Sequence, residues 1–119
     1  MKLRAIKIDK RFIPEWNDNK SLPSNEQVVI EFSRIPATSE EQNYKGFKFD
    51  SSGTMQLVYN DNMLISTFVS KVSNLGMDDG TKIKTGTELA TANNPALKDL
   101  FTEIRAYLFP ADEELTAGE

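Results

Sequence analysis

The sequence predicts an α+β domain in which a small antiparallel sheet from the N-terminal half packs against two or three helices from the C-terminal half. Two observations support this prediction. Apolar residues alternate with polar ones, as they do in strands, in several runs before residue 60. After residue 60 they recur mainly at helical spacing. Strands followed by helices are typical of α+β proteins rather than of alternating α/β folds.

Three stretches in the first half have the pattern of strands. Residues 2–9 form a plausible first strand, and residues 27–35 form the clearest one, which Pro36 ends because proline cannot donate to a sheet. Residues 47–59 contain two alternating runs around a turn at residues 51–53, so we expect a hairpin there. The apolar residues that set these periods are Ile6, Ile8, Val28, Ile30, Phe32, Phe47, Phe49, Met55, Leu57 and Tyr59.

A helix is predicted to follow directly. Asn60 and its neighbours Asp61 and Asn62 offer N-caps, and the apolar stripe continues to Leu75. Gly76 is well placed to end the helix in a left-handed conformation. The stripe consists of Leu64, Phe68, Val72 and Leu75, widened by Ile65 and Val69. A short edge strand is then expected at residues 81–84.

Two further helices begin at recognisable caps. The segment Thr85–Glu88 fits a capping box and should start a helix of about two turns that ends by Asn93. Asn94 then caps a longer helix, with Pro95 in its first turn, where a missing N–H costs nothing. This helix should bury Leu97, Leu100, Phe101, Ile104 and Leu108 and should stop at Pro110.

The 119 residues are expected to form one domain at residues 1–109, followed by a flexible acidic tail at 110–119. Residues 12–26 contain two prolines and several asparagines and aspartates, so they are expected to form a loop. Trp16 lies in this loop, either as a plug over the edge of the core or as a contact for a partner.

Composition argues against an enzyme. The chain contains no histidine and no cysteine, which removes the common catalytic triads and the usual zinc and iron–sulfur ligands. Carboxylates remain, but Asp78-Asp79 precedes a glycine in a turn, and Glu40-Glu41 lies in a polar loop. Asp99 and Glu103 share a helix face, which we interpret as a solvated surface. No catalytic residue, cofactor, metal or small-molecule substrate is therefore expected.

The net charge of −4 is unevenly distributed, with a basic start and an acidic end. The basic start is either a strand with solvated lysines or an arm that contacts phosphate or an acidic partner. Because the chain is acidic overall and no aromatic residues interleave with these cations, we expect no nucleic-acid partner. No apolar run reaches the length of a membrane span or a signal peptide, so we expect a cytoplasmic protein without a membrane partner.

The stretch FIPEWNDNKSLPSNEQVVIEFSRIPATSE, the helix at 64–75 and the ending IKTGTELATANNPALKDLFTEIRAYLF resemble small proteins of the tail-morphogenesis region of tailed bacteriophages. Many of these are called tail assembly chaperones. The resemblance covers roughly residues 1–109, and its most recognisable part is Ile83–Glu119. It implies a binding protein that holds the tape-measure protein soluble in the host cytoplasm, and it brings no catalytic residues.

Four aromatic residues are candidates for a protein interface because they are not part of the predicted core: Trp16, Tyr44, Tyr107 and Phe109. Ordinary packing is the alternative for each. Besides the chaperone, the residues leave open a structural virion component, such as a head–tail connector or tail-tube protein that forms a ring of identical copies. A small carboxylate enzyme is the third possibility. The expected partners are accordingly phage tail proteins or further copies of the chain.

Overall fold

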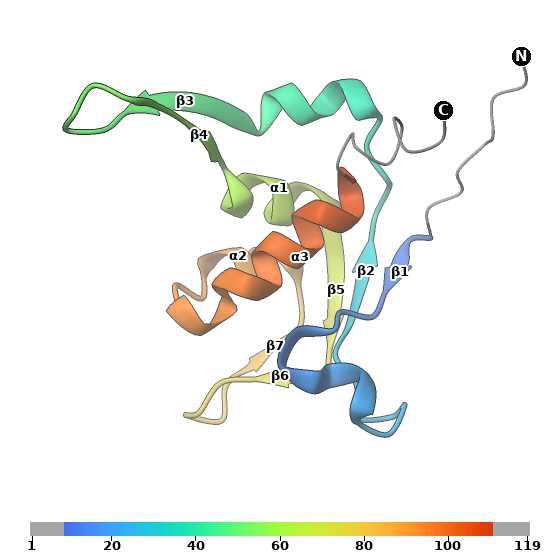
Figure 1. Cartoon of the computed structure of the whole chain (residues 1–119). Helices are drawn as coiled ribbons and strands as arrows, with labels where there is room; N and C mark the ends of the chain where they lie inside the picture. Colours follow the sequence, from blue (N-terminus) through green and yellow to red (C-terminus); the bar gives the residue numbers. More distant parts are fainter. Residues whose placement is uncertain (1–8, 111–119) are drawn as a thin grey trace, which may run out of the picture.

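The computed structural model describes residues 9–110 (Figure 1) and confirms an α+β fold. It contains three small antiparallel sheets and a set of helices, with one hydrophobic core whose residues extend from Val28 to Phe109. The predicted strand at residues 2–9 falls almost wholly outside the described residues, as does the acidic tail after Pro110.

The largest sheet contains three strands in the order β1 (Arg11–Phe12), β2 (Val29–Phe32) and β5 (Val69–Ser73), all antiparallel. Strand β2 is the centre of the predicted strand at 27–35, and its residues Ile30 and Phe32 are buried. The sheet is not built from the N-terminal half alone, because β5 belongs to the second half of the chain.

Helix α1 (Asp61–Phe68) begins as predicted, with the Asn60 side chain accepting a hydrogen bond from the Met63 N–H at 3.2 Å. The predicted extension of this helix to Leu75 is wrong, since the chain leaves the helix after Phe68 and enters β5. The Ser33 N–H donates to the Phe68 carbonyl at 2.8 Å, so a group beyond β2 satisfies the end of the helix.

A β-bulge explains why the sequence of β5 looked helical. In the register with β2, Glu31 faces Lys71 and Phe32 faces Val69, so Ser70 is an extra residue. The bulge places Val69 and Val72 on the buried side although they are three residues apart, which is the spacing of a helix face.

The predicted helix end at Gly76 is also wrong. Gly76 lies in β6 (Leu75–Gly76), which pairs with β7 (Lys82–Ile83) and confirms the expected edge strand. The left-handed residue is Asn74, with φ of 61°. Its side-chain amide donates to the carbonyl oxygens of Asn25 and Gln27 at 3.1 and 2.8 Å, which ties the turn after β5 to the loop before β2.

The predicted hairpin is confirmed by β3 (Lys45–Phe49) and β4 (Met55–Tyr59), which pair over five residues. The short 3-10 helix η2 (Thr38–Asn43) precedes it. The Asp50 carboxylate closes the turn by accepting from the N–H groups of Ser52 and Thr54, both at 2.9 Å. Figure 1 shows the hairpin (green) projecting from the body, away from the three-stranded sheet.

The two C-terminal helices begin at the predicted caps. Thr85 Oγ1 accepts from the Glu88 N–H at 3.1 Å at the start of α2 (Gly86–Thr91). The Asn94 side chain caps the 3-10 turn η3 (Pro95–Leu97), which leads directly into α3 (Lys98–Leu108). Four of the five predicted residues are buried and Phe101 is half-buried: η3 contributes Leu97, and α3 contributes Leu100, Ile104 and Leu108.

The predicted loop at 12–26 contains the 3-10 segment η1 (Trp16–Ser21). Asn19 holds it in place, because its buried amide donates to the Pro14 and Val28 carbonyls at 2.9 Å and accepts from the Val28 N–H at 2.6 Å. Glu103 of α3 accepts from the Trp16 N–H at 3.1 Å. The interpretation of Glu103 as a solvated surface residue is therefore wrong.

Candidate protein-binding surfaces

Two of the four predicted interface residues lie in the core. Tyr44 is 7% exposed and packs edge-on against Phe68, with ring centroids 5.5 Å apart. Phe109 is 8% exposed and belongs to the same core. Trp16 is half-buried and packs against the edge of the core. Tyr44 and Phe109 thus offer almost no surface, while Trp16 keeps part of its indole accessible.

Tyr107 is the fourth residue and is half-buried. Its ring stacks on Phe12 and Phe32, with centroids 4.2 and 5.8 Å apart. Its hydroxyl donates to the Asp9 carbonyl at 2.7 Å. Burial raises the pKa of this phenol above its ordinary value. These contacts join α3 to the three-stranded sheet, which gives Tyr107 a structural role.

Among residues 9–110, the exposed large apolar side chains gather mainly on the β3–β4 hairpin. Phe47 faces Leu57 and Phe49 faces Met55, so the four side chains lie on one side of the hairpin. They are 65%, 47%, 70% and 57% exposed, respectively. We call these four residues the apolar hairpin face. If a fully exposed phenylalanine presents about 200 Å², the two rings alone leave about 270 Å² of apolar surface in water.

Such a surface marks a binding site more often than scattered apolar residues do. With Met55 and Leu57 included, the apolar hairpin face is on the order of 400 Å², the scale of the largest patch on a typical monomer. The opposite side of the hairpin carries Lys48 and Gln56 toward the tip, where it is polar, and the half-buried Val58 near the base. The hairpin is therefore amphipathic, with its apolar side open to solvent.

The base of the hairpin is held firmly against the body. The Arg105 guanidinium lies 4.1 Å from the centre of the Tyr59 ring and donates to both carboxylate oxygens of Asp61 at 2.8 and 2.9 Å. The Tyr59 hydroxyl donates to Glu41 at 3.3 Å. The Asn60 N–H also donates to the Tyr44 carbonyl at 2.7 Å. A fixed base lets the hairpin present its apolar side in one orientation.

Sequence reasoning placed the hairpin correctly but did not identify its apolar side as a candidate site. Alternation at Phe47, Phe49, Met55 and Leu57 indicates that one side of a hairpin is apolar, and such a side normally packs on the core. The sequence contains many apolar residues for a small core, which is the one sign that some of them stay exposed. Alternation alone does not show which ones.

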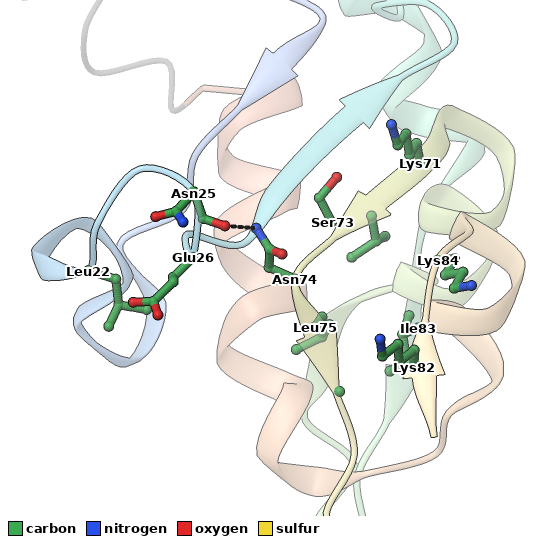
Figure 2. A pocket seen from close by; sticks show the side chains of 12 residues that line it. Leu22, Asn25, Glu26, Lys71, Ser73, Asn74, Leu75, Lys82, Ile83 and Lys84 are labelled. Carbon is green, nitrogen blue, oxygen red and sulfur yellow. Dashed lines mark hydrogen bonds between the residues drawn. The ribbon is translucent and has the colours of Figure 1, made fainter. Parts of the chain in front are cut away.

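A second candidate surface is an open groove of about 720 Å³ at the other end of the molecule (Figure 2). Its floor contains the buried side chains of Val72, Leu75 and Ile83, contributed by β5, β6 and β7. Leu22, which is 43% exposed, stands on the rim. We call this surface the lysine groove, because Lys71, Lys82 and Lys84 line it.

Charge distinguishes the lysine groove from the apolar hairpin face. Against the three lysines the groove has one lining carboxylate, Glu26. Lys71 also lies 3.8 Å from the Glu31 carboxylate on the neighbouring strand. An apolar floor with a cationic rim fits an apolar side chain from a segment that carries acidic residues.

Three acidic side chains, Glu40, Asp50 and Asp79, have surroundings that lower the pKa of their carboxyl groups. The Arg34 guanidinium donates to both oxygens of Glu40 at 2.7 and 2.8 Å and lowers the pKa of this carboxyl to about 2. Hydrogen bonds within their turns lower the pKa values of Asp50 and Asp79. A general acid or base near neutral pH needs a raised carboxyl pKa instead.

Within residues 9–110, no three acidic side chains come together in a way that could hold a metal ion. Across the same residues, no helix combines the length and apolar composition of a membrane span. Comparison of the chain with protein-family models, with curated proteins and with solved structures found no match. The fold and the two surfaces define only a class of protein: an α+β domain with a hairpin whose apolar side is exposed.

Proposed function

We propose that this chain is a non-enzymatic binding protein that acts in bacteriophage tail morphogenesis, in the host cytoplasm, by binding tail proteins such as the tape-measure protein. The observation that carries the proposal is the apolar hairpin face, which is displayed on a projecting and anchored hairpin. The resemblance of Ile83–Glu119 and of the preceding segments to tail-region proteins supplies the biological setting.

The physical mechanism is capture of an apolar segment. A long protein chain that has not yet assembled with its partners exposes apolar side chains. These side chains make it prone to aggregate unless another protein covers them. Phe47 and Phe49 offer aromatic surface at a low cost in conformational entropy, and aromatic anchors are typical of binding hot spots. Because the base of the hairpin is anchored at Tyr59, binding costs less conformational entropy than it would for a mobile hairpin. The lysine groove is a second place at which an acidic part of the same partner can bind.

The test is co-expression of the chain with fragments of a tape-measure protein from a tailed phage, followed by size-exclusion chromatography with light scattering. The test variant carries Phe47→Thr and Phe49→Thr, since threonine suits a strand and both rings are mostly exposed. The matched control is Lys48→Thr, which changes the same strand on its other side.

We expect the unaltered chain and the Lys48→Thr control to form a complex with at least one fragment and to keep that fragment soluble. The double variant should lose at least tenfold in affinity. The proposal is wrong if no tail protein binds the unaltered chain, or if the double variant binds as tightly as the control.

A structural virion component that assembles into a ring is the second candidate. The apolar hairpin face supports this second function as well, because another subunit of a ring can also cover it. Mass spectrometry of purified particles separates the two functions. A chaperone should be absent from finished particles, whereas a ring component should be present in a fixed ratio to the other tail or connector proteins.

A further inference from the structure

The distal half of the hairpin has little to stabilise it within one copy of the chain. Strands β3 and β4 pair only with each other among the described strands, and a two-stranded hairpin is marginally stable in water. Arg105 and Tyr44 hold its base, but Phe47, Phe49, Met55 and Leu57 remain exposed. The free protein therefore gains stability from anything that covers these residues.

We propose that a second copy of this chain covers the apolar hairpin face whenever no other partner is bound, giving a weak two-fold dimer. This inference rests on the proposed function, because it treats the same face as the binding surface. A tail protein and the second copy then compete for it, so the dimer is the resting form of the binding protein.

The layout of the face suits self-association. Its aromatic residues lie on β3 and its aliphatic residues on β4, in register with each other. A two-fold axis parallel to the strands places the aromatic row of one copy over the aliphatic row of the other. Both copies then bury the same residues, as an isologous interface requires.

Other occupants fit less well. The hairpin tip is polar and carries Asp50, Ser51 and Ser52, so the apolar residues cannot enter a lipid surface tip first. Insertion into the lysine groove of a neighbouring copy would bring Lys45, which lies on the same side of the hairpin as Phe47, toward the groove lysines, which is electrostatically unfavourable. A face-to-face contact leaves Lys48 on the outer side of the hairpin and places Lys45 at the base, where its Nζ lies 4.0 Å from the Glu41 carboxylate.

Buried area sets the strength of the dimer. Two faces on the order of 400 Å² give about 800 Å² in total, below the range of about 1,200–2,000 Å² that is typical of stable complexes. The dimer should therefore form at high micromolar concentration and dissociate on dilution. Because the contact is apolar, added salt should leave it unchanged or strengthen it.

Analytical ultracentrifugation of the full chain between about 1 μM and about 1 mM tests the proposal. The weight-average mass should rise from 13.4 kDa toward twice that value for the unaltered chain and for Lys48→Thr, at low and at high salt alike. The Phe47→Thr, Phe49→Thr variant should dimerise at least tenfold more weakly. A chain that stays monomeric throughout, a double variant that dimerises like the control, or a dimer that salt dissolves would each overturn it.

A second measurement does not depend on the folding of the double variant. The chain has no cysteine, so Ser51→Cys provides a single site for a spin label at the hairpin turn. Labelled copies are mixed with unlabelled, isotope-enriched copies, and only contacts between copies broaden the amide signals. Broadening confined to β3 and β4 is expected, and broadening around the lysine groove instead would contradict the face-to-face arrangement.

The two proposals can fail separately. A chain that is monomeric at every concentration yet binds a tape-measure fragment would overturn the dimer and leave the proposed function in place. A salt-resistant dimer that depends on Phe47 and Phe49 but binds no tail protein would support the dimer and refute the chaperone function.

Discussion

Arg105 on α3 holds Asp61 at the start of α1 through two hydrogen bonds from one guanidinium nitrogen, at 2.8 and 2.9 Å. The same guanidinium covers the Tyr59 ring at the end of β4. Both partners of the ion pair are less than a quarter exposed. One side chain thus joins the last helix, the first helix and the base of the hairpin.

Replacing Arg105 with methionine should lower the free energy of unfolding by about 1–3 kcal/mol, because it removes charged hydrogen bonds and leaves the partly buried Asp61 carboxylate without them. Amide hydrogen exchange in β3 and β4 should accelerate as well. Urea unfolding and exchange measurements check both effects. Lys98→Met on the exposed side of the same helix is the control and should change stability by less than about 0.5 kcal/mol.

Gly86→Ala should be strongly destabilising, by about 3 kcal/mol or more. A Cβ atom at Gly86 would collide with the Val69 carbonyl oxygen and lie 2.9 Å from that of Ile65, and neither backbone group can move without disturbing α1 or β5. Gly46→Ala is the matched control, since nothing lies within 4 Å of its Cβ position. Thermal unfolding should separate the two variants clearly, and equal melting temperatures would contradict this reading.

Asn19→Ala should cost about 2–3 kcal/mol of unfolding free energy, because the substitution removes three hydrogen bonds and leaves the buried Val28 N–H without its acceptor. The loop at 12–26 should loosen first, which fluorescence of Trp16 can report. Asn25→Ala, at an exposed position in the same loop, should have little effect. A variant at Asn19 that unfolds at the same urea concentration as Asn25→Ala would refute the proposed role.

Acid should weaken the link between Arg34 and Glu40. The pKa of the Glu40 carboxyl is lowered from 4.5 to about 2 in the folded protein, so the folded state binds this proton less readily than the unfolded state. Its contribution to stability is complete above about pH 4.5 and disappears as the pH falls toward 2.

Glu40→Gln should therefore be less stable than the unaltered chain near neutral pH, and the difference should shrink through this acidic window. Urea unfolding across the pH range measures it. Glu26→Gln, at an exposed position, is the control. A stability difference for Glu40→Gln that stays constant down to about pH 2 would show that the ion pair does not account for the effect.

Local signals predicted much of this fold. The caps at Asn60, Thr85 and Asn94 each accept the expected hydrogen bond, because capping depends on a few neighbouring residues. The hairpin followed from alternation and a glycine-containing turn. Such features need no knowledge of distant parts of the chain.

The helix predicted through Leu75 failed for a non-local reason. Val69 and Val72 keep a helical spacing only because Ser70 bulges out of the pairing with β2. The bulge depends on a strand some forty residues earlier in the chain, so no local pattern reveals it. Pairing with β2 overrode the helical period.

The sequence predicted that the candidate site contains aromatic residues, but it did not predict which ones. Aromatic residues were expected at an interface, yet Tyr44 and Phe109 are buried, while Phe47 and Phe49 are exposed. Which aromatic residues reach the core depends on how far the hairpin extends beyond the body. The base of the hairpin is held by Arg105 and Asp61, which come from α3 and α1.

The hydrogen bond from the Tyr107 hydroxyl to the Asp9 carbonyl brings the first described residue against the last helix. Together with the Phe12–Tyr107 stack, it places the start of the described segment beside the helix that ends it. A circular permutant that joins these two ends through a short linker should therefore keep the fold. New ends opened at the exposed turn between β6 and β7, near Asp78, would leave both the hairpin and this junction intact.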